Sequence, residues 1–150
     1  MLRETAALLV VFAVGCGGSA PPSPDREWIA NARGVVEQLR SDVVAVSGYD
    51  RLETARAGLR DESQLYGLLV AYTDFGGCRH MVAAVGAEPP GLARAVKLLR
   101  RACLHLQRAD GLFTRAVARR APHLLARATR EAIAARPSLD AAALELSHRA

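Results

Sequence analysis

Several residue types and patterns are scarce in this sequence, and their scarcity limits what the protein can be. Lysine occurs once, as Lys97, among 20 basic residues, and aromatic residues make up 5% of the chain. The longest uninterrupted apolar run, residues 6–14, is too short to cross a bilayer as a helix. Alternation of apolar and polar residues, which is typical of strands, is absent at any useful length, and this favours an all-α fold.

Sequence motifs for catalysis and for metal or haem binding are also missing. The chain has no Gly-x-Ser-x-Gly nucleophile elbow and no Cys-x-x-Cys-His run for haem attachment. Its carboxylates alternate with basic residues on predicted helix surfaces, where such groups are ordinarily solvated. The histidines are scattered along the chain: His80, His105, His123 and His148. We therefore expect no enzyme, no bound metal and no other cofactor.

The N-terminal residues follow the order of an export signal. Arg3 and the free amine precede the apolar run 6–14, which leads into the tetrapeptide Ala13-Val14-Gly15-Cys16. This tetrapeptide resembles the lipobox of bacterial lipoproteins, in which a cysteine is diacylated, exposed by cleavage before it, and N-acylated. The resemblance implies a signal peptide over residues 1–15 and lipid attachment at Cys16.

The residues after the cysteine support an anchored protein. Residues 16–24 are rich in glycine, serine and proline, a composition typical of a flexible, partly extended tether. Two or more acyl chains hold a protein on a membrane almost permanently. In a cell with two membranes, Gly17 in place of the aspartate that signals inner-membrane retention favours the periplasmic face of the outer membrane. The alternative is a cytosolic protein with an apolar N-terminal helix.

The chain that remains after residue 24 is long enough for one compact domain, and we predict a single helical domain over residues 25–150. With Cys16 assigned to lipid, Cys78 and Cys103 form an even pair in an oxidising compartment, which predicts a disulfide. Zinc is the alternative, because His80 and His105 each follow a cysteine by two residues. Residues two apart on a helix point about 200° from one another, so such a pair cannot face one ion.

Apolar residues at spacings of three and four predict four to six helices packed as a bundle. The first is capped by Ser23 or Asp25 and ends at Ser47-Gly48. Asp50 and Glu53 have the spacing of a capping box for a short helix, and Ser63 can cap the next one. Core positions are expected for four aromatic residues: Trp28, Tyr72, Phe75 and Phe113.

Two central helices, over residues 65–85 and 92–106, are predicted to form an antiparallel hairpin around the loop Glu88-Pro89-Pro90. Cys78 and Cys103 lie on the inward stripes at comparable distances from the turn. Their bond would stabilise the fold by roughly 3 to 4 kcal/mol. The pair Gly76-Gly77 interrupts the first stripe and indicates a kink or a close helix contact.

The C-terminal part is predicted to contain a helix that begins at Asp110-Gly111, a helix that begins at Pro122 and a last helix that begins at Pro137-Ser138. A helix running unbroken through Asp110 would place that acid on its apolar face, so we expect a break there. If no break exists, six basic residues fall within about 60° of one another: Arg94, Lys97, Arg101, Arg108, Arg115 and Arg119.

Charge is divided unequally along the chain. Residues 16–75 carry six basic and nine acidic groups, whereas residues 76–150 carry thirteen and five. A basic half predicts a surface for an anionic envelope component or an acidic protein, and not for nucleic acid outside the cytoplasm. The function indicated is binding or scaffolding at the membrane. The alternative is an enzyme, a metal-handling protein or a small-ligand carrier whose site joins residues remote in sequence.

Overall fold

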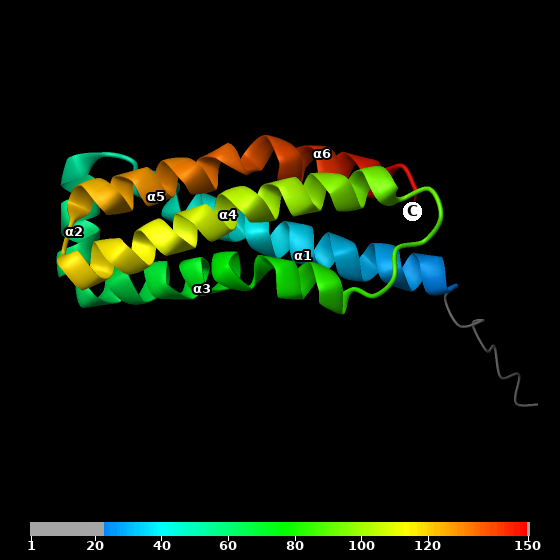
Figure 1. Ribbon diagram of the computed structural model, residues 1–150, viewed down its shortest axis with the longest axis horizontal. Coiled ribbons are helices and arrows are strands. Elements are labelled where there is room, and N and C mark those ends of the chain that lie inside the picture. The colour runs from blue at the N-terminus through cyan, green and yellow to red at the C-terminus, as the bar shows by residue number, and fades with distance from the viewer. Residues whose placement is uncertain (1–22, 150) are drawn as a thin grey trace, which may run out of the picture.

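The computed structural model describes residues 23–149, and these form an all-helical bundle (Figure 1). The prediction of an all-α fold with four to six helices is confirmed, since no strand occurs among the described residues and the α-helices number six. The predicted signal peptide, Cys16 and most of the tether lie outside these residues. In chain order the elements are α1 (Pro24–Val46), the 3-10 turn η1 (Ser47–Tyr49), α2 (Leu52–Arg60), α3 (Glu62–Ala84), α4 (Ala93–Arg119), α5 (Pro122–Ala134) and α6 (Arg136–Ser147).

The helices occupy four parallel rows, of which α1, α3 and α4 each fill one (Figure 1). The fourth row is shared by α5 and α6, which follow one another with Ala135 between them. Helix α4 contacts α3 on one side and α5 and α6 on the other, while α1 contacts α3 and α6. Helix α2 packs against α5 and α3 at one end of the bundle. Such short connections between amphipathic helices are the ordinary route to a four-row bundle.

The core is built from aliphatic side chains around an aromatic cluster. Tyr72 stacks on Phe113 with ring centroids 4.2 Å apart and meets Phe75 edge to face at 5.1 Å. Its hydroxyl shares a hydrogen bond of 3.3 Å with the hydroxyl of Thr129 on α5. Trp28 is buried as well. The predicted core positions of the four aromatic residues are therefore confirmed.

Helix starts are confirmed for α1 and corrected for α2 and α3. The Oγ atom of Ser23 accepts a hydrogen bond from the amide of Arg26, as expected of an N-cap. The predicted capping box at Asp50 is wrong, because Asp50 has helical backbone angles at the end of η1, whereas an N-cap residue needs an extended backbone. Asp61, rather than Ser63, caps α3 by accepting the amide of Gln64 at 2.8 Å.

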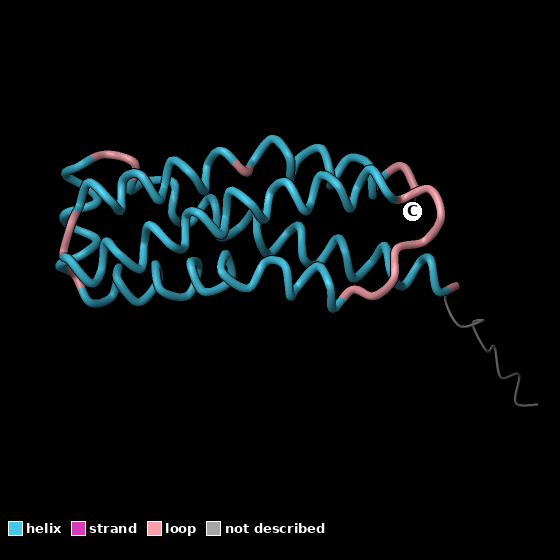
Figure 2. Tube along the Cα trace, in the orientation of Figure 1, coloured by secondary structure: helices cyan, strands magenta, loops and turns pink. Residues whose placement is uncertain are grey.

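The central hairpin is confirmed, including its disulfide. Cys78 on α3 and Cys103 on α4 are bonded, with their Cα atoms 5.4 Å apart. The loop of residues 85–92 is the longest connection among the described residues (Figure 2). Gly86 and Gly91 adopt φ values of 102° and 86°, which side chains with a Cβ rarely adopt. This loop lies at the same end of the bundle as the start of α1 (Figure 1).

The predicted break at Asp110-Gly111 is wrong, because α4 continues from Ala93 to Arg119. The half-buried Asp110 carboxylate faces the backbone of α3 at Gly76, and a Cβ atom at Gly76 would lie 2.8 Å from its Oδ2 atom. Glycine on the facing helix therefore leaves room for an acid on the inner side of α4. Burial raises the pKa of the Asp110 carboxyl. Of the two alternatives for the glycine pair, Gly76 is the site of a close helix contact.

Candidate anion-binding face and groove

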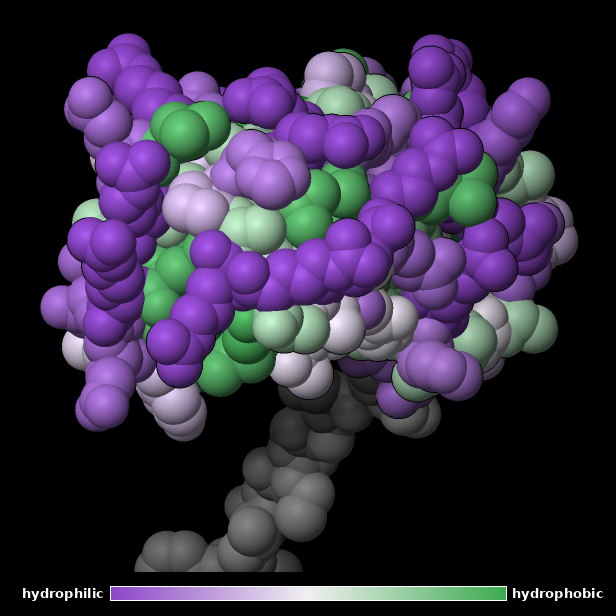
Figure 3. All heavy atoms as spheres, turned by 60° about the vertical axis from the view of Figure 1, so that its left-hand side comes forward, coloured by the Kyte–Doolittle hydropathy of each residue, from purple (hydrophilic) through white to green (hydrophobic). Residues whose placement is uncertain are grey.

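The unbroken α4 places the six predicted basic residues on one side of a long helix. From Arg94 to Arg119 there are 25 steps of 1.5 Å along the helix axis, so the stripe extends about 38 Å. We call this surface the basic face of α4, and all six side chains are exposed: Arg94, Lys97, Arg101, Arg108, Arg115 and Arg119. Figure 3 shows, on the side of the molecule that includes the α2 end, long hydrophilic side chains lying across smaller hydrophobic areas.

Part of the basic face is engaged within the protein. The Nε atom of Arg94 lies 3.1 Å from Oε1 of Glu145 on α6, and Arg115 donates to the carbonyl of Gly111 on its own helix. Within residues 23–149, the other four side chains have no carboxylate oxygen within 4.0 Å: Lys97, Arg101, Arg108 and Arg119. These four cations are available to an anion from outside the domain.

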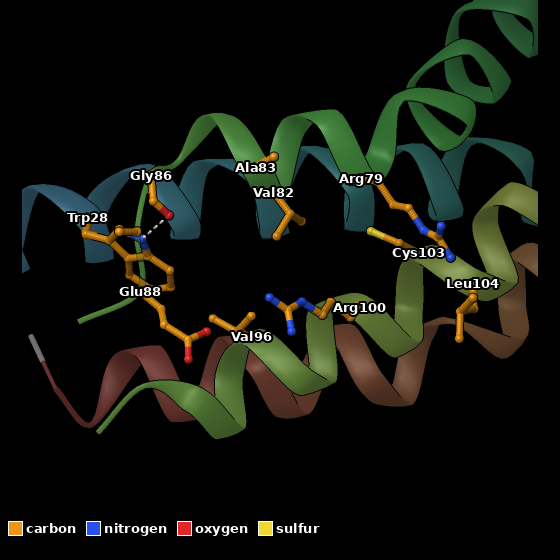
Figure 4. Close-up of a pocket in the computed structure, with 11 residues that line it drawn as sticks. Trp28, Arg79, Val82, Ala83, Gly86, Glu88, Val96, Arg100, Cys103 and Leu104 are labelled. Atoms are coloured by element: carbon orange, nitrogen blue, oxygen red, sulfur yellow. Dashed lines mark hydrogen bonds between the residues drawn. The ribbon is translucent and has the colours of Figure 1, made fainter. Parts of the chain in front are cut away.

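An open groove lies beside this face, between the C-terminal half of α3 and the N-terminal half of α4 (Figure 4). Its volume is about 560 Å³. Helix α3 contributes Arg79, Val82 and Ala83, and Trp28 on α1 contributes to one end. The remaining lining comes from the loop and from α4: Gly86, Ala87, Glu88, Val96, Arg100, Cys103 and Leu104.

Small side chains produce the groove, because valine and alanine at the α3–α4 interface do not fill the space between the two backbones. Cys103 lines the groove, and its disulfide with Cys78 joins α4 to α3 at that point. At the loop end, the Trp28 indole Nε1 donates a hydrogen bond of 3.2 Å to the carbonyl of Gly86 (Figure 4). The walls are thus held by a covalent bond and by a hydrogen bond between α1 and the loop.

Charges are placed at different parts of the groove. Arg79 on α3 lies beside Cys103, whereas Arg100 on α4 extends along the groove toward Val96 (Figure 4). Glu88 lies near Trp28 at the loop end (Figure 4). Neither arginine forms an ion pair with a residue of the described part of the chain. Leu104, which also lines the groove, is 45% exposed. The arrangement combines apolar walls with two exposed guanidinium groups that pair with no carboxylate of the described residues.

Sequence reasoning did not find Arg79 and Arg100. The stripe belongs to a single helix, whereas Arg79 lies on α3 and Arg100 points at least 60° away from the six basic residues of α4. A signal was present in the predicted disulfide between Cys78 and Cys103. Arg100 precedes Cys103 by three residues, so the two side chains point within about 60° of each other on α4. Arg79, next to Cys78, lies at the edge of the same interhelical space.

A second polar cluster joins α1 to α3. Asp42, which is 7% exposed, and Asp74 both accept hydrogen bonds from the side-chain amide of Gln38, at 3.2–3.3 Å. Burial raises the pKa of Asp42 to about 6; the hydrogen bond from Gln38 lowers it, and the neighbouring Asp74 raises it further. The Gln38 side chain that bridges the two acids is exposed, so the cluster links α1 to α3 at the edge of the core.

The two cysteines and two histidines considered as zinc ligands do not form a site in the structure. Both cysteines are consumed by the disulfide, His80 is exposed, and Nδ1 of His105 lies 3.1 Å from Oε2 of Glu131 on α5. Residues 23–149 contain no group of three or more histidine, cysteine or acidic side chains that could hold a metal ion.

None of the helices in that range is both long enough and apolar enough to traverse a bilayer. No known protein family, curated protein or solved structure matches the chain.

Proposed function

We propose that the protein is an exported lipoprotein, anchored through Cys16, that binds an anionic component of the cell envelope through the basic face of α4. The observation that carries the proposal is the set of four exposed cations on one stripe without a carboxylate partner in the described domain. Clustered charge of one sign attracts anionic partners and speeds their association. The proposal assigns binding or scaffolding to the protein and no catalytic step.

Anionic phospholipid headgroups fit this surface best among envelope components. The start of α1, where the predicted tether joins the domain, lies at the same end of the bundle as the start of α4 (Figure 1). A domain tethered there therefore holds Arg94, Lys97 and Arg101 at its membrane-proximal end. Basic side chains near an anionic membrane surface contribute about 1 kcal/mol each at moderate ionic strength.

The anchor is tested by intact-mass analysis of protein extracted from membranes. We expect a mass that lacks residues 1–15, carries acyl chains and gains two hydrogens on reduction of the disulfide. The variant Cys16→Ser should lack the acyl chains. An unprocessed and unacylated wild-type chain would contradict export and anchoring.

The binding face is tested by flotation of the full Cys16→Ser chain with vesicles of phosphatidylcholine, with and without phosphatidylglycerol. The excess of binding on anionic vesicles should disappear at high salt. Replacing the four unpaired cations by glutamine should weaken this excess at least about tenfold, given about 1 kcal/mol for each engaged cation. The four substituted residues are Lys97, Arg101, Arg108 and Arg119.

A charge-matched control separates a specific face from net charge alone. Four exposed arginines on α1, at the N-cap of α2 and on α2 are replaced by glutamine in the control variant: Arg26, Arg51, Arg56 and Arg60. Both variants carry the same net charge. Equal losses in the two variants would contradict a binding role for the basic face of α4, because only overall charge would then matter.

A further inference from the structure

We propose that the groove between α3 and α4 is a binding site for a free fatty acid, with its carboxylate between Arg79 and Arg100 and its acyl chain directed along the valines toward Trp28. This site is separate from the basic face of α4, which faces outward from the same helix. The inference therefore goes beyond the binding of anionic headgroups. It assigns a ligand class to a surface that the proposed function does not use.

The walls of the groove match an acyl chain. Val82 and Val96 face each other across it, and the indole of Trp28 lies at its far end (Figure 4). A volume of about 560 Å³ is within the range of pockets that bind small molecules. Apolar walls open to water are stabilised when an apolar ligand displaces that water. An unbranched chain suits an elongated space between two roughly parallel helices.

The charges select an anion and orient it. The guanidinium group is a planar fork that binds a carboxylate through paired hydrogen bonds, and both Arg79 and Arg100 lack an ion-pair partner within residues 23–149. Glu88 at the Trp28 end repels a second carboxylate (Figure 4). The ligand headgroup is thereby directed to the arginines, and its chain is directed to the indole.

The site is held in shape before the ligand arrives. The Cys78–Cys103 bond fixes the separation of the two helices, and the Trp28 indole is held by the Gly86 carbonyl. A preformed site loses less conformational entropy on binding than one that must be assembled. Both arginines are exposed, so their side chains can turn toward a carboxylate placed between them.

The test uses Trp28, which is the single tryptophan of the chain. The full lipidated chain is placed in phosphatidylcholine nanodiscs and titrated with dibromostearate, whose bromine atoms quench indole fluorescence on contact. We expect saturable quenching of Trp28. The uncharged methyl ester of the same acid should bind about tenfold more weakly, because it lacks the charge-assisted hydrogen bonds.

Substitutions separate the groove from the basic face. The double variant Arg79→Gln/Arg100→Gln should bind the acid about tenfold or more weakly, while Arg101→Gln/Arg108→Gln should bind as the wild type does. The two pairs remove the same charge from exposed positions, so both variants are expected to fold. Ala83→Phe, at another exposed position, should block the groove. The Arg101/Arg108 pair lowers vesicle binding if the proposed function holds, so each proposal can fail alone.

Two results would overturn the inference. Quenching that does not saturate, or that is equal in Ala83→Phe, means that the acid acts from the bilayer and not from the groove. Quenching that is absent from the lipidated chain but present in Cys16→Ser means that the protein's own acyl chains fill the groove, so that no free fatty acid is the ligand.

Discussion

The raised pKa of the Asp42 carboxyl predicts that the free energy of unfolding falls as the pH rises from about 4 to above 6. Burial raises its pKa from the ordinary value of 3.8 to about 6, so the folded protein holds this proton more tightly than the unfolded chain does. The stabilisation is complete below about pH 4 and is lost as the pH rises through 6. A shift of this size corresponds to an upper bound of about 3 kcal/mol at 1.36 kcal/mol per pKa unit. Because Gln38 beside it is exposed, solvent screens the Asp42 carboxylate, and we expect its ionisation to lower the free energy of unfolding by about 1–2 kcal/mol.

The perturbation that isolates this group is Asp42→Asn, which keeps the shape and removes the charge. At pH 7 we expect the variant to exceed the wild type in free energy of unfolding by about 1–2 kcal/mol, and near pH 4 we expect the two to converge. Urea denaturation followed by Trp28 fluorescence measures both values. The exposed Glu88→Gln serves as the control and should leave the difference between the two pH values unchanged.

The reasoning would be refuted by a variant that is less stable than the wild type at pH 7. It would also be refuted by a difference that is the same at pH 4 and pH 7. In the first case the hydrogen bonds from Gln38 would stabilise the Asp42 carboxylate more than burial penalises it, and in the second the two effects would cancel and leave its pKa unshifted.

Two further predictions concern helix packing. Gly76→Ala should lower the free energy of unfolding by roughly 1–3 kcal/mol, because its Cβ atom would lie 2.8 Å from the Asp110 carboxylate, whereas Gly77→Ala, with open space around it, should raise this free energy by up to about 1 kcal/mol. Urea titrations of the two variants must show changes in the free energy of unfolding of opposite sign. Replacing Cys78 and Cys103 by alanine should cost about 3.5 kcal/mol, the chain-entropy value for a loop of 25 residues. Calorimetry of the oxidised wild type and the double variant checks this, and equal unfolding temperatures would contradict it.

The features that sequence alone could predict are those that depend on local patterns. The hairpin of α3 and α4, its disulfide and the buried Trp28 follow from apolar residues at spacings of three and four and from an even pair of cysteines. The cap at Ser23 follows from local hydrogen-bonding chemistry in the same way. Periodicity therefore accounts for the helical class and for most of the core.

Features that depend on what a neighbouring helix presents could not be predicted. Asp110 suggested a helix start because an acid on an apolar stripe is unfavourable, and only the absence of a side chain at Gly76 on α3 removes the conflict. The groove is likewise a property of two helices, since Arg79 and Arg100 are 21 positions apart in the chain and line one groove only because α3 and α4 pack side by side. The burial of Asp42 depends on α3 in the same way.

The bond between Cys78 and Cys103 also changes what a break in the chain would do. The connection of residues 85–92 is exposed at residues 86–88 and at residues 90 and 91, and its two glycines adopt positive φ values. Exposed loop segments are the usual targets of proteases. Cleavage there would cut the chain into two pieces. They would remain one covalent molecule, because the disulfide joins Cys78 in the first piece to Cys103 in the second. If the protein is anchored as proposed, the N-terminal piece would thus retain the basic C-terminal piece.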